Sequence, residues 1–534
     1  MDHRNRFRLE SLGIFLFALL LFTLGIWDQQ PQGFDGRWAL FLQEMFRHGA
    51  SLFPTTYGQP YADYPGTATF FSYVFARLFG APNHLVNVLP TALASAGVVA
   101  LIYRLLVPAS RPWALLTVLL TLLTTQLLEK SRSVCLDQMV ALLCVGSFYL
   151  LHSGERLGSR LRQLAVFPLF ILGFAIRGPL GLIEVCGVVC VYWALGSPGE
   201  RVRQVLVHGI VGLVLLAACW WLLVKLARIS GGDAFADEVF KMQVGGRLDE
   251  SGEPFYFYFQ LSLYRYFPVV PLALLTLVAL RHRWAERFDN PVQLVMRLGA
   301  CGLMILLGLS VPHFKRAYYI LPTVPMFAAV AAYGLLQAQG WLLGVRRGYE
   351  GLVAALPALC VVAVFVCRHG WQKHGYWPDV SLQLLVGGLL LLQVAAVLAW
   401  RRAGRLVWLS AFALGAQWLV LVTVVEPAKD LQFDTRQFVG QVEALRVSQP
   451  GQLVFLNLGR DTWAVRYMMN LDHDEQPLFV GAAEVERLGA LPRPSWVIVA
   501  RKETALLKGT PLERLAPSFE GRLNDNPLMV FLLK

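Results

Sequence analysis

Long apolar runs separated by short polar segments dominate this chain. An α-helix needs about 20 residues to cross the ~30 Å hydrocarbon core of a bilayer, and runs close to that length recur as far as residue 425. They predict about thirteen transmembrane helices, at roughly 11–27, 84–106, 112–128, 135–152, 164–177, 179–195, 204–226, 264–280, 294–311, 317–340, 351–367, 381–400 and 405–425. The first run follows several arginines, as a signal peptide does, but it ends at Leu24-Gly25-Ile26-Trp27 without a small-residue cleavage site. We therefore interpret it as a retained helix.

The arginines between the apolar runs orient these spans. If the N-terminus is cytoplasmic, every predicted inside loop is basic, as the positive-inside rule requires. The arginines concerned are at positions 104 and 111; 156, 160 and 162; 201 and 203; 281, 283 and 287; 346 and 347; and 401, 402 and 405. An odd number of spans then leaves the C-terminal tail outside. The sequence therefore predicts a multi-pass protein of the cell inner membrane with a cytoplasmic N-terminus and a periplasmic tail, if the cell is Gram-negative.

Long segments lie on the predicted outer side, the first of them at 28–83. Within it, residues 38–46 have apolar positions at helical spacing, while Glu44 and its polar neighbours face the other way. Residues 67–79 follow as a second stretch of this kind. Both patterns are typical of helices that lie at the membrane interface.

The tail differs in composition from the rest of the chain. Strand-like runs at 453–456 and 496–499 stand among polar helical stretches, which predicts a small α/β domain. The expected fold is therefore mainly α, with a transmembrane domain over residues 1–425 and an α/β domain over 426–534.

Composition and charge limit the class of protein further. Of the 534 residues, 56% are hydrophobic and 15% charged, and the mean hydropathy is +0.52, so lipid is the main solvent. The net charge of +12 is spread over short runs between spans, which argues against a nucleic-acid partner. The eight cysteines contain no C-x-x-C pair and are interpreted as buried reduced thiols.

One short acidic motif raises the question of a metal ion. Asp472-His473-Asp474 has the D-x-D form that nucleotide-sugar enzymes use to hold a metal, but such a sequence between strands is usually a turn. The sequence is compatible with a divalent metal and predicts none, and it predicts no other cofactor.

Asp35 begins the first predicted interfacial helix, after Gly33 and Phe34. A carboxylate at that position is typical of a helix N-cap. A carboxylate at the membrane surface also suits a general base, and one side chain can do both. Both interpretations stay open on the sequence.

Asp137 lies near the outer end of an otherwise apolar span. An ionisable group at such depth is costly unless it is paired or hydrated, so a functional role is the first hypothesis. The alternative is a structural ion pair with Arg132 or with another outer arginine.

Several cations are predicted on the same side of the membrane. Arg177-Gly178-Pro179 interrupts an apolar stretch, and Pro179 suits the first turn of a new helix, so the arginine and the helix N-terminus together suit an anion. Residues 310–319 begin another predicted helix and contain His313, Lys315 and Arg316. The alternative is that these side chains extend to lipid headgroups.

At these positions the chain resembles the GT-C fold membrane glycosyltransferases, in the group that contains the aminoarabinose transferase of lipid A and the protein O-mannosyltransferases. The resemblance covers residues 1–425 and rests on four segments in order, at 34–38, 131–137, 177–179 and 312–322. It departs from the family at Asp63-Tyr64-Pro65, where relatives have lysine in place of the tyrosine, and at Arg177, where they often have lysine. These positions contact the donor phosphate in relatives, so the reaction class is better determined than the donor.

The resemblance implies transfer of a sugar from a polyprenyl-phosphate donor to an acceptor, which is lipid A, another envelope glycan or a protein. Asp35, or Asp137 in its place, would act as the base, with inversion at the anomeric carbon and no nucleotide. The residues implied in binding the donor phosphate are Arg37, Arg177, Arg247, Lys315 and Arg316. The further candidates for substrate binding are Glu44, Asp63, Tyr64, His313 and Tyr318.

Two other classes of protein compete with this interpretation. A transporter or flippase of a lipid-linked sugar would also need a basic outer cavity, but transporters usually place charges near the bilayer midplane and often show inverted repeats, and the sequence shows neither. A noncatalytic envelope assembly protein would leave the outer charged residues unexplained.

Overall fold

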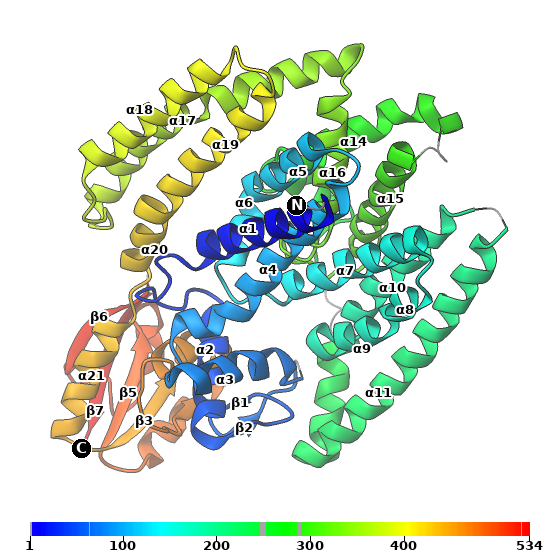
Figure 1. Cartoon of the computed structure of the whole chain (residues 1–534). Coiled ribbons are helices and arrows are strands. Elements are labelled where there is room, and N and C mark those ends of the chain that lie inside the picture. The colour runs from blue at the N-terminus through cyan, green and yellow to red at the C-terminus, as the bar shows by residue number, and fades with distance from the viewer. Residues whose placement is uncertain (1–2, 64, 198, 246–251, 287–289, 525) are drawn as a thin grey trace.

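The computed structural model describes residues 3–534 except for positions 64, 198, 246–251, 287–289 and 525. It consists of a large helical part and a smaller domain around a mixed β-sheet, and α2 lies between the two (Figure 1). The helices before the C-terminal domain are α1 (His3–Thr23), α2 (Asp35–His48), α3 (Thr67–Phe79), α4 (His84–Leu106), α5 (Arg111–Leu123), α6 (Thr125–Ser131), α7 (Leu136–Leu157), α8 (Arg160–Leu164), α9 (Val166–Arg177), α10 (Pro179–Ala194), α11 (Arg201–Phe240), α13 (Phe257–Ser262), α14 (Val269–Leu280), α15 (Asn290–Ser310), α16 (Thr323–Leu336), α17 (Trp341–Lys373), α18 (Leu382–Ala399) and α19 (Arg405–Val420).

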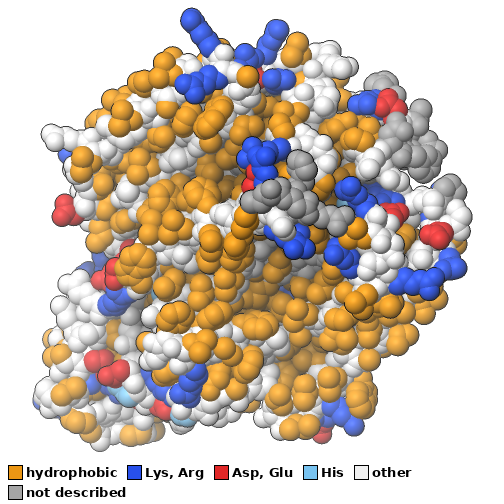
Figure 2. All heavy atoms as spheres, viewed as in Figure 1, with side chains coloured by type: hydrophobic (Ala, Val, Ile, Leu, Met, Phe, Trp, Pro, Cys, Tyr) orange, Lys and Arg blue, Asp and Glu red, His pale blue; other side chains and the backbone are white. Residues whose placement is uncertain are grey.

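Many of these helices have the length and composition of membrane spans. Within the described residues, seven helices are long and apolar enough to cross a bilayer, or eight if the bent pair α5 and α6 forms one span. Three shorter apolar helices, α10, α14 and α16, accompany them. Hydrophobic side chains cover much of the helical part in the view of Figure 2. The chain is therefore a polytopic membrane protein, while the number thirteen stays a prediction.

The observed elements differ from the predicted runs at several places. The run expected at 112–128 bends by 74° at Thr124, where α5 ends and α6 begins. The run expected from residue 317 becomes helical only at Thr323. The last predicted span does not end in a loop, because α19 passes through the π-helical turn η3 (Leu421–Val425) directly into α20 (Glu426–Gln432).

The C-terminal domain is α/β, as predicted. Its remaining helices are α21 (Arg436–Ser448) and α22 (Val465–Met468), and its strands are β3 (Gln452–Leu456), β4 (Leu478–Val480), β5 (Ser495–Ala500), β6 (Phe519–Leu523) and β7 (Asn526–Leu533). The strand order is β4-β3-β5-β7-β6; β3 runs parallel to β4 and β5, and β7 runs antiparallel to β5 and β6. All six residues of β5 are buried, because apolar clusters cover both faces of the sheet.

The expectation for α2 needs a correction. Its apolar face does not lie in lipid, because Phe41, Leu42 and Met45 are buried inside the protein. Its polar face is not solvated either. Glu44 is buried and accepts hydrogen bonds from the backbone N–H groups of Tyr57 and Gly58, in the turn between β1 (Thr55–Thr56) and β2 (Gln59–Pro60). The helical period was predicted, but not the C-terminal domain that covers the other side.

Candidate active site

A cavity of about 760 Å³ lies where the helical part meets the C-terminal domain. Its walls come from the start of α2, the segment around the α6–α7 junction, the end of α9, the loop before α16, and α20 with parts of the C-terminal domain. The ionisable residues that line it are Asp35, Arg37, Asp63, His84, Glu129, Lys130, Arg132, Asp137, Arg177, Arg316, Glu426, Lys429, Asp461 and Arg466, together with the tyrosines Tyr61, Tyr318 and Tyr319. Charged groups that are distant in the sequence thus meet in one space.

Asp35 is the first residue of α2 and is only 6% exposed. Its side chain does not cap the helix: the N-cap is Phe34, without a side-chain cap bond. Instead, Oδ2 accepts a weak hydrogen bond from the N–H of Val134, at 3.3 Å. Burial raises the pKa of Asp35 to about 7, against the opposing charge of Lys130. The N-cap interpretation is therefore wrong, and the fold holds a carboxyl group that changes charge near neutral pH.

Asp137 and Arg177 form a buried ion pair. Arg177 Nε lies 3.2 Å from Asp137 Oδ1, with both side chains at most 2% exposed. Arg177 is the last residue of α9, and Gly178, at φ +68°, separates it from Pro179, the first residue of α10. The predicted helix break is thus present. The guanidinium also lies 4.6 Å from the ring centre of Tyr319, so two contacts hold it in place.

The predicted alternative for Asp137, an ion pair with Arg132 or with another outer arginine, is confirmed by the pair with Arg177. Asp137 is paired, but its partner is Arg177 rather than Arg132. Arg132 bonds Glu426 instead, at 2.6 Å from Nε to Oε1.

Other cations of the cavity have aromatic rather than carboxylate neighbours. Arg316 lies over the rings of Phe34 and Phe314, at 5.5 and 4.9 Å. Lys130 Nζ lies 5.4 Å from the ring centre of Tyr318. Among the described residues, neither cation has a carboxylate within 4 Å, so both can neutralise an incoming anion.

Arg37 is less available to an incoming anion than Lys130 or Arg316, because Asp63 Oδ2 lies 3.9 Å from its Nη1. Its buried Nε has no hydrogen-bond partner among the described residues. The pair Arg37–Asp63 stands beside Asp35 at the cavity wall.

The remaining sequence candidates do not meet in this cavity. Glu44 is used by the β1–β2 turn, and His313 is exposed outside the cavity. Lys315 is buried, and its Nζ donates to the carbonyl of Glu253 at 2.7 Å. Arg247 and Tyr64 lie outside the described residues.

Several charged residues that line the cavity were not among the candidates from the sequence: Glu129, Lys130, Arg132, Glu426, Lys429, Asp461 and Arg466. Lys429 Nζ lies 2.9 Å from Glu129 Oε1, beside the pair Arg132–Glu426. The sequence contains one indication of these residues: the charged run Glu129-Lys130-Ser131-Arg132 directly follows an apolar stretch. Their partners on α20 resemble an ordinary polar tail and gave no signal.

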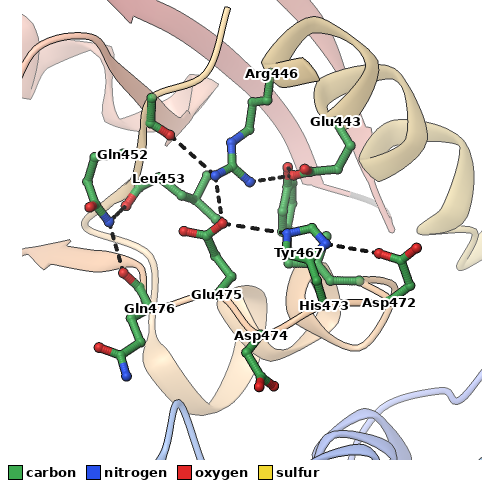
Figure 3. Close-up of polar contacts among 12 residues, drawn as sticks. Glu443, Arg446, Gln452, Leu453, Tyr467, Asp472, His473, Asp474, Glu475 and Gln476 are labelled. Atoms are coloured by element: carbon green, nitrogen blue, oxygen red, sulfur yellow. Dashed lines mark hydrogen bonds and ion pairs between the residues drawn. The ribbon is translucent and has the colours of Figure 1, made fainter.

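The D-x-D motif of the C-terminal domain is part of an ion-pair network (Figure 3). His473 contacts Asp472 and Glu475, and Glu475 bonds Arg446 at 2.7 Å. Asp474 points away from this group in Figure 3 and binds Arg47 and His48 of α2. No group of three or more potential metal ligands occurs within the described part of the chain. The motif therefore connects the C-terminal domain to α2.

The chain thus combines a bundle of apolar helices, a segment with the two packed helices α2 and α3, and an α/β domain over a charged cavity. No protein-family model and no curated protein matches this sequence. Among solved structures, ArnT from Cupriavidus metallidurans in the apo state is similar, with a TM-score of 0.74 and 14% identity over 97% of each chain. The same values apply to that ArnT bound to undecaprenyl phosphate.

A second solved structure shares the fold more loosely. The Archaeoglobus fulgidus oligosaccharyltransferase in the apo form matches with a TM-score of 0.51 and 11% identity, over 92% of this chain and 70% of that chain. Identities this low establish the fold alone. The chain therefore has the GT-C fold, and the resemblance predicted from the sequence is confirmed at that level.

Proposed function

We propose that this protein is a glycosyltransferase that moves a sugar from a polyprenyl-phosphate donor to an acceptor at the outer face of the inner membrane. The observation that carries the proposal is the cavity, which combines a buried carboxyl group of near-neutral pKa with two cations that have no carboxylate within 4 Å among the described residues. The likeness to an ArnT that was solved with undecaprenyl phosphate bound supports a lipid phosphate as the anion.

The charges of the cavity suggest how the donor is held. Lys130 and Arg316 are the cations available to the donor phosphate, and the fixed guanidinium of Arg177 lies in the same wall. When the bond between the anomeric carbon and the phosphate oxygen breaks, the phosphate gains a negative charge. Cations already in place stabilise that charge without reorganisation. No nucleotide and no metal is part of the proposal.

Asp35 is the better candidate for the base. The carboxylate of Asp137 is already engaged by the guanidinium of Arg177, with Nε 3.2 Å from Oδ1. In the part of the chain that the structure describes, Asp35 has no ion-pair partner, and its raised pKa suits proton uptake near neutral pH. One base and a phosphate leaving group suffice for a single displacement, which predicts inversion of the anomeric centre.

The topology of the proposal follows the arginine distribution. The N-terminus is cytoplasmic and the C-terminal domain periplasmic, so the cavity opens where a lipid-linked sugar is presented outside. The location in the inner membrane rests on this orientation.

The test is sugar transfer by the purified protein in lipid nanodiscs, with undecaprenyl-phosphate donors that carry a hexose, a pentose or an aminopentose, and with an extract of the source organism's envelope as acceptor. We expect wild type to release undecaprenyl phosphate and Asp35→Asn to bind it normally without turnover. Asp28→Asn is the matched control, because Asp28 is exposed and lies outside the cavity.

The competing function gives a different result. If no donor is consumed while a labelled lipid-linked sugar crosses the bilayer of proteoliposomes, the protein is a flippase and the proposal fails. Full activity of Asp35→Asn would remove Asp35 as the base and leave the reaction class standing.

A further inference from the structure

We infer that the acceptor binds as an uncharged hydroxyl compound, in the half of the cavity that the C-terminal domain closes. This inference rests on the proposed function and names its acceptor class. It follows from an uneven distribution of charge between two sets of lining residues: those that pair with α20 or belong to the C-terminal domain, together with Gln32 and His84, called the domain-side half, and the others, called the membrane-side half.

The membrane-side half of the cavity has an excess of positive charge, which the attraction between Lys130 and Asp35 only partly offsets. It contains the neutral pair Asp137–Arg177, and in addition Lys130 and Arg316, neither of which has a carboxylate within 4 Å among the described residues. One lipid phosphate would neutralise this positive charge. This half therefore suits the donor.

The domain-side half is electrically balanced. Arg132 is bonded to Glu426 at 2.6 Å, and Lys429 to Glu129 at 2.9 Å. The C-terminal domain itself adds one charge of each sign, Asp461 and Arg466, and the neutral amide of Asn524. Gln29, Gln30 and Gln32 extend the same wall. A second phosphate in this half would find no uncompensated cation, whereas hydroxyl groups find donors and acceptors.

His84 provides the sharpest feature of this half. The residue is 8% exposed and lines the cavity, and its Nδ1 has no hydrogen-bond partner in the described part of the chain. Capping of α4 does not require it, because the side chain of Asn83 accepts from the N–H of Val86. A neutral imidazole offers one donor and one acceptor, which matches a hydroxyl group.

The reaction in this arrangement is a balanced exchange. The acceptor hydroxyl oxygen forms a bond to the anomeric carbon and gives its proton to the Asp35 carboxylate. The bond from that carbon to the phosphate oxygen breaks, and its electron pair stays on the phosphate. The products are a glycoside and a polyprenyl phosphate, and Asp35 returns its proton to water.

The first test determines which kind of bond is formed, a glycoside or a glycosyl phosphate, so the acceptor need not be identified. Label transferred from undecaprenyl-phosphate sugars into the envelope extract is treated with mild acid, which cleaves a glycosyl phosphate and spares a glycoside. We expect the label to stay attached, and transfer to be unaffected when the extract is first treated with phosphomonoesterase. Release of the label by mild acid overturns the inference and leaves the transferase standing. If undecaprenyl phosphate is not released at all, the proposed function itself has failed.

The second test locates the acceptor half. Asp461→Asn removes one hydrogen-bonding charge, and we expect about a tenfold higher acceptor concentration for half-maximal rate, with the Kd for undecaprenyl phosphate unchanged. Lys130→Met should weaken the Kd for undecaprenyl phosphate and leave the acceptor concentration for half-maximal rate unchanged. Asp472→Asn is the control, because that aspartate is exposed in the same domain and lies outside the cavity. A change in the Kd for undecaprenyl phosphate on Asp461→Asn, with acceptor dependence unaltered, would contradict the placement.

Discussion

Asp35 is a buried carboxyl group with a single weak hydrogen bond, and its pKa of about 7 follows from burial. A base must be ionised to accept a proton, so activity should require the form that exists above this pKa. We expect log kcat/KM of wild type to fall with a slope of one below about pH 7 and to be level above it. A pH–rate profile on an undecaprenyl-phosphate sugar measures this. A profile that is flat from pH 5 to pH 8 would exclude Asp35 as the base.

The same pKa affects stability, with a defined sign. The pKa is raised from an ordinary 3.8, so the folded state keeps a proton that the unfolded state loses, and stability falls as the pH rises from about 4 to 7. Ionised Asp35 then costs on the order of 4 kcal/mol above pH 7. Asp35→Asn should raise the thermal midpoint at pH 8 and change it little at pH 4. Asp28→Asn should change it at neither pH; equal effects of Asp35→Asn at the two pH values would contradict the burial argument.

The pair Arg177–Asp137 allows a graded test. Arg177→Met leaves Asp137 buried without its bonded cation, which typically costs about 3–5 kcal/mol. Arg177→Lys keeps the charge and loses the planar fork. We therefore expect the lysine variant to fold with a donor KM about tenfold higher, and the methionine variant to lose thermal stability as well. Thermal midpoints and donor KM values for both variants decide this; equal stability of the two would mean that the pair has no structural role.

How much of the site the sequence predicted depended on the surroundings of each residue. Asp137 and Arg177 stand out because ionisable groups at the end of an apolar run are rare. Glu426 gave no such signal, since its partner Arg132 lies 294 positions away and its neighbours are polar. Glu44 was placed on the correct helix face, but nothing in its neighbourhood specified the hairpin that it bonds.

At the scale of elements, the break between α9 and α10 positions Arg177. Gly178 has φ +68° and ψ −153°, a conformation that is almost confined to glycine. A Cβ there would lie 2.6 Å from Oε1 of Gln243, in the turn η1 (Lys241–Gly245) over the cavity. The end of α9, the start of α10 and this turn therefore pack closely together because residue 178 has no side chain.

Gly178→Ala should for this reason lower donor affinity as well as stability. Gly340→Ala is the matched control, because Gly340 has φ 55° and ψ −130° before α17 with no atom within 4 Å of an added Cβ. Both variants carry backbone strain, but only the first displaces Gln243. We expect a weaker Kd for undecaprenyl phosphate in Gly178→Ala alone. An equal Kd in the two variants would mean that the contact with Gln243 does not position Arg177.

Hydropathy predicted the helices better than the joints between them. The span at 84–106 matches α4, because this run is apolar along its whole length and polar residues flank it. The 74° bend at Thr124 had no signal in the sequence, since no glycine or proline marks it. That bend places Lys130 in the cavity wall.

On the scale of the whole molecule, the C-terminal domain completes the cavity wall with Asp461, Arg466 and Asn524. The sequence predicted an α/β domain, but its contribution of residues to the site depends on how it docks. Gln30 specifies part of that docking, because its side-chain carbonyl accepts from the N–H and the hydroxyl of Thr435. Such contacts join positions about 400 residues apart, so local sequence patterns do not contain them.

Two ion pairs join the α6 region to α20, and their difference in burial yields a prediction for the assembly. The side chain of Arg132 is 1% exposed and also donates to the carbonyls of Leu21 and Leu24, at the end of α1. The side chain of Lys429 is 35% exposed. Loss of a buried partner typically costs about 3 kcal/mol or more, and loss of a half-exposed pair about 1 kcal/mol or less.

Arg132→Met should therefore lower the thermal midpoint clearly and make the junction between α20 and the C-terminal domain sensitive to protease, while Lys429→Met should do neither. Because both residues line the cavity, both variants alter its charge by one unit. Only loss of the buried pair should separate its two walls, so acceptor and donor dependence should worsen together in Arg132→Met. If the two variants unfold at the same temperature and show the same protease pattern, burial of the Arg132–Glu426 pair does not hold the C-terminal domain against the membrane helices, and the contacts of Gln30 suffice.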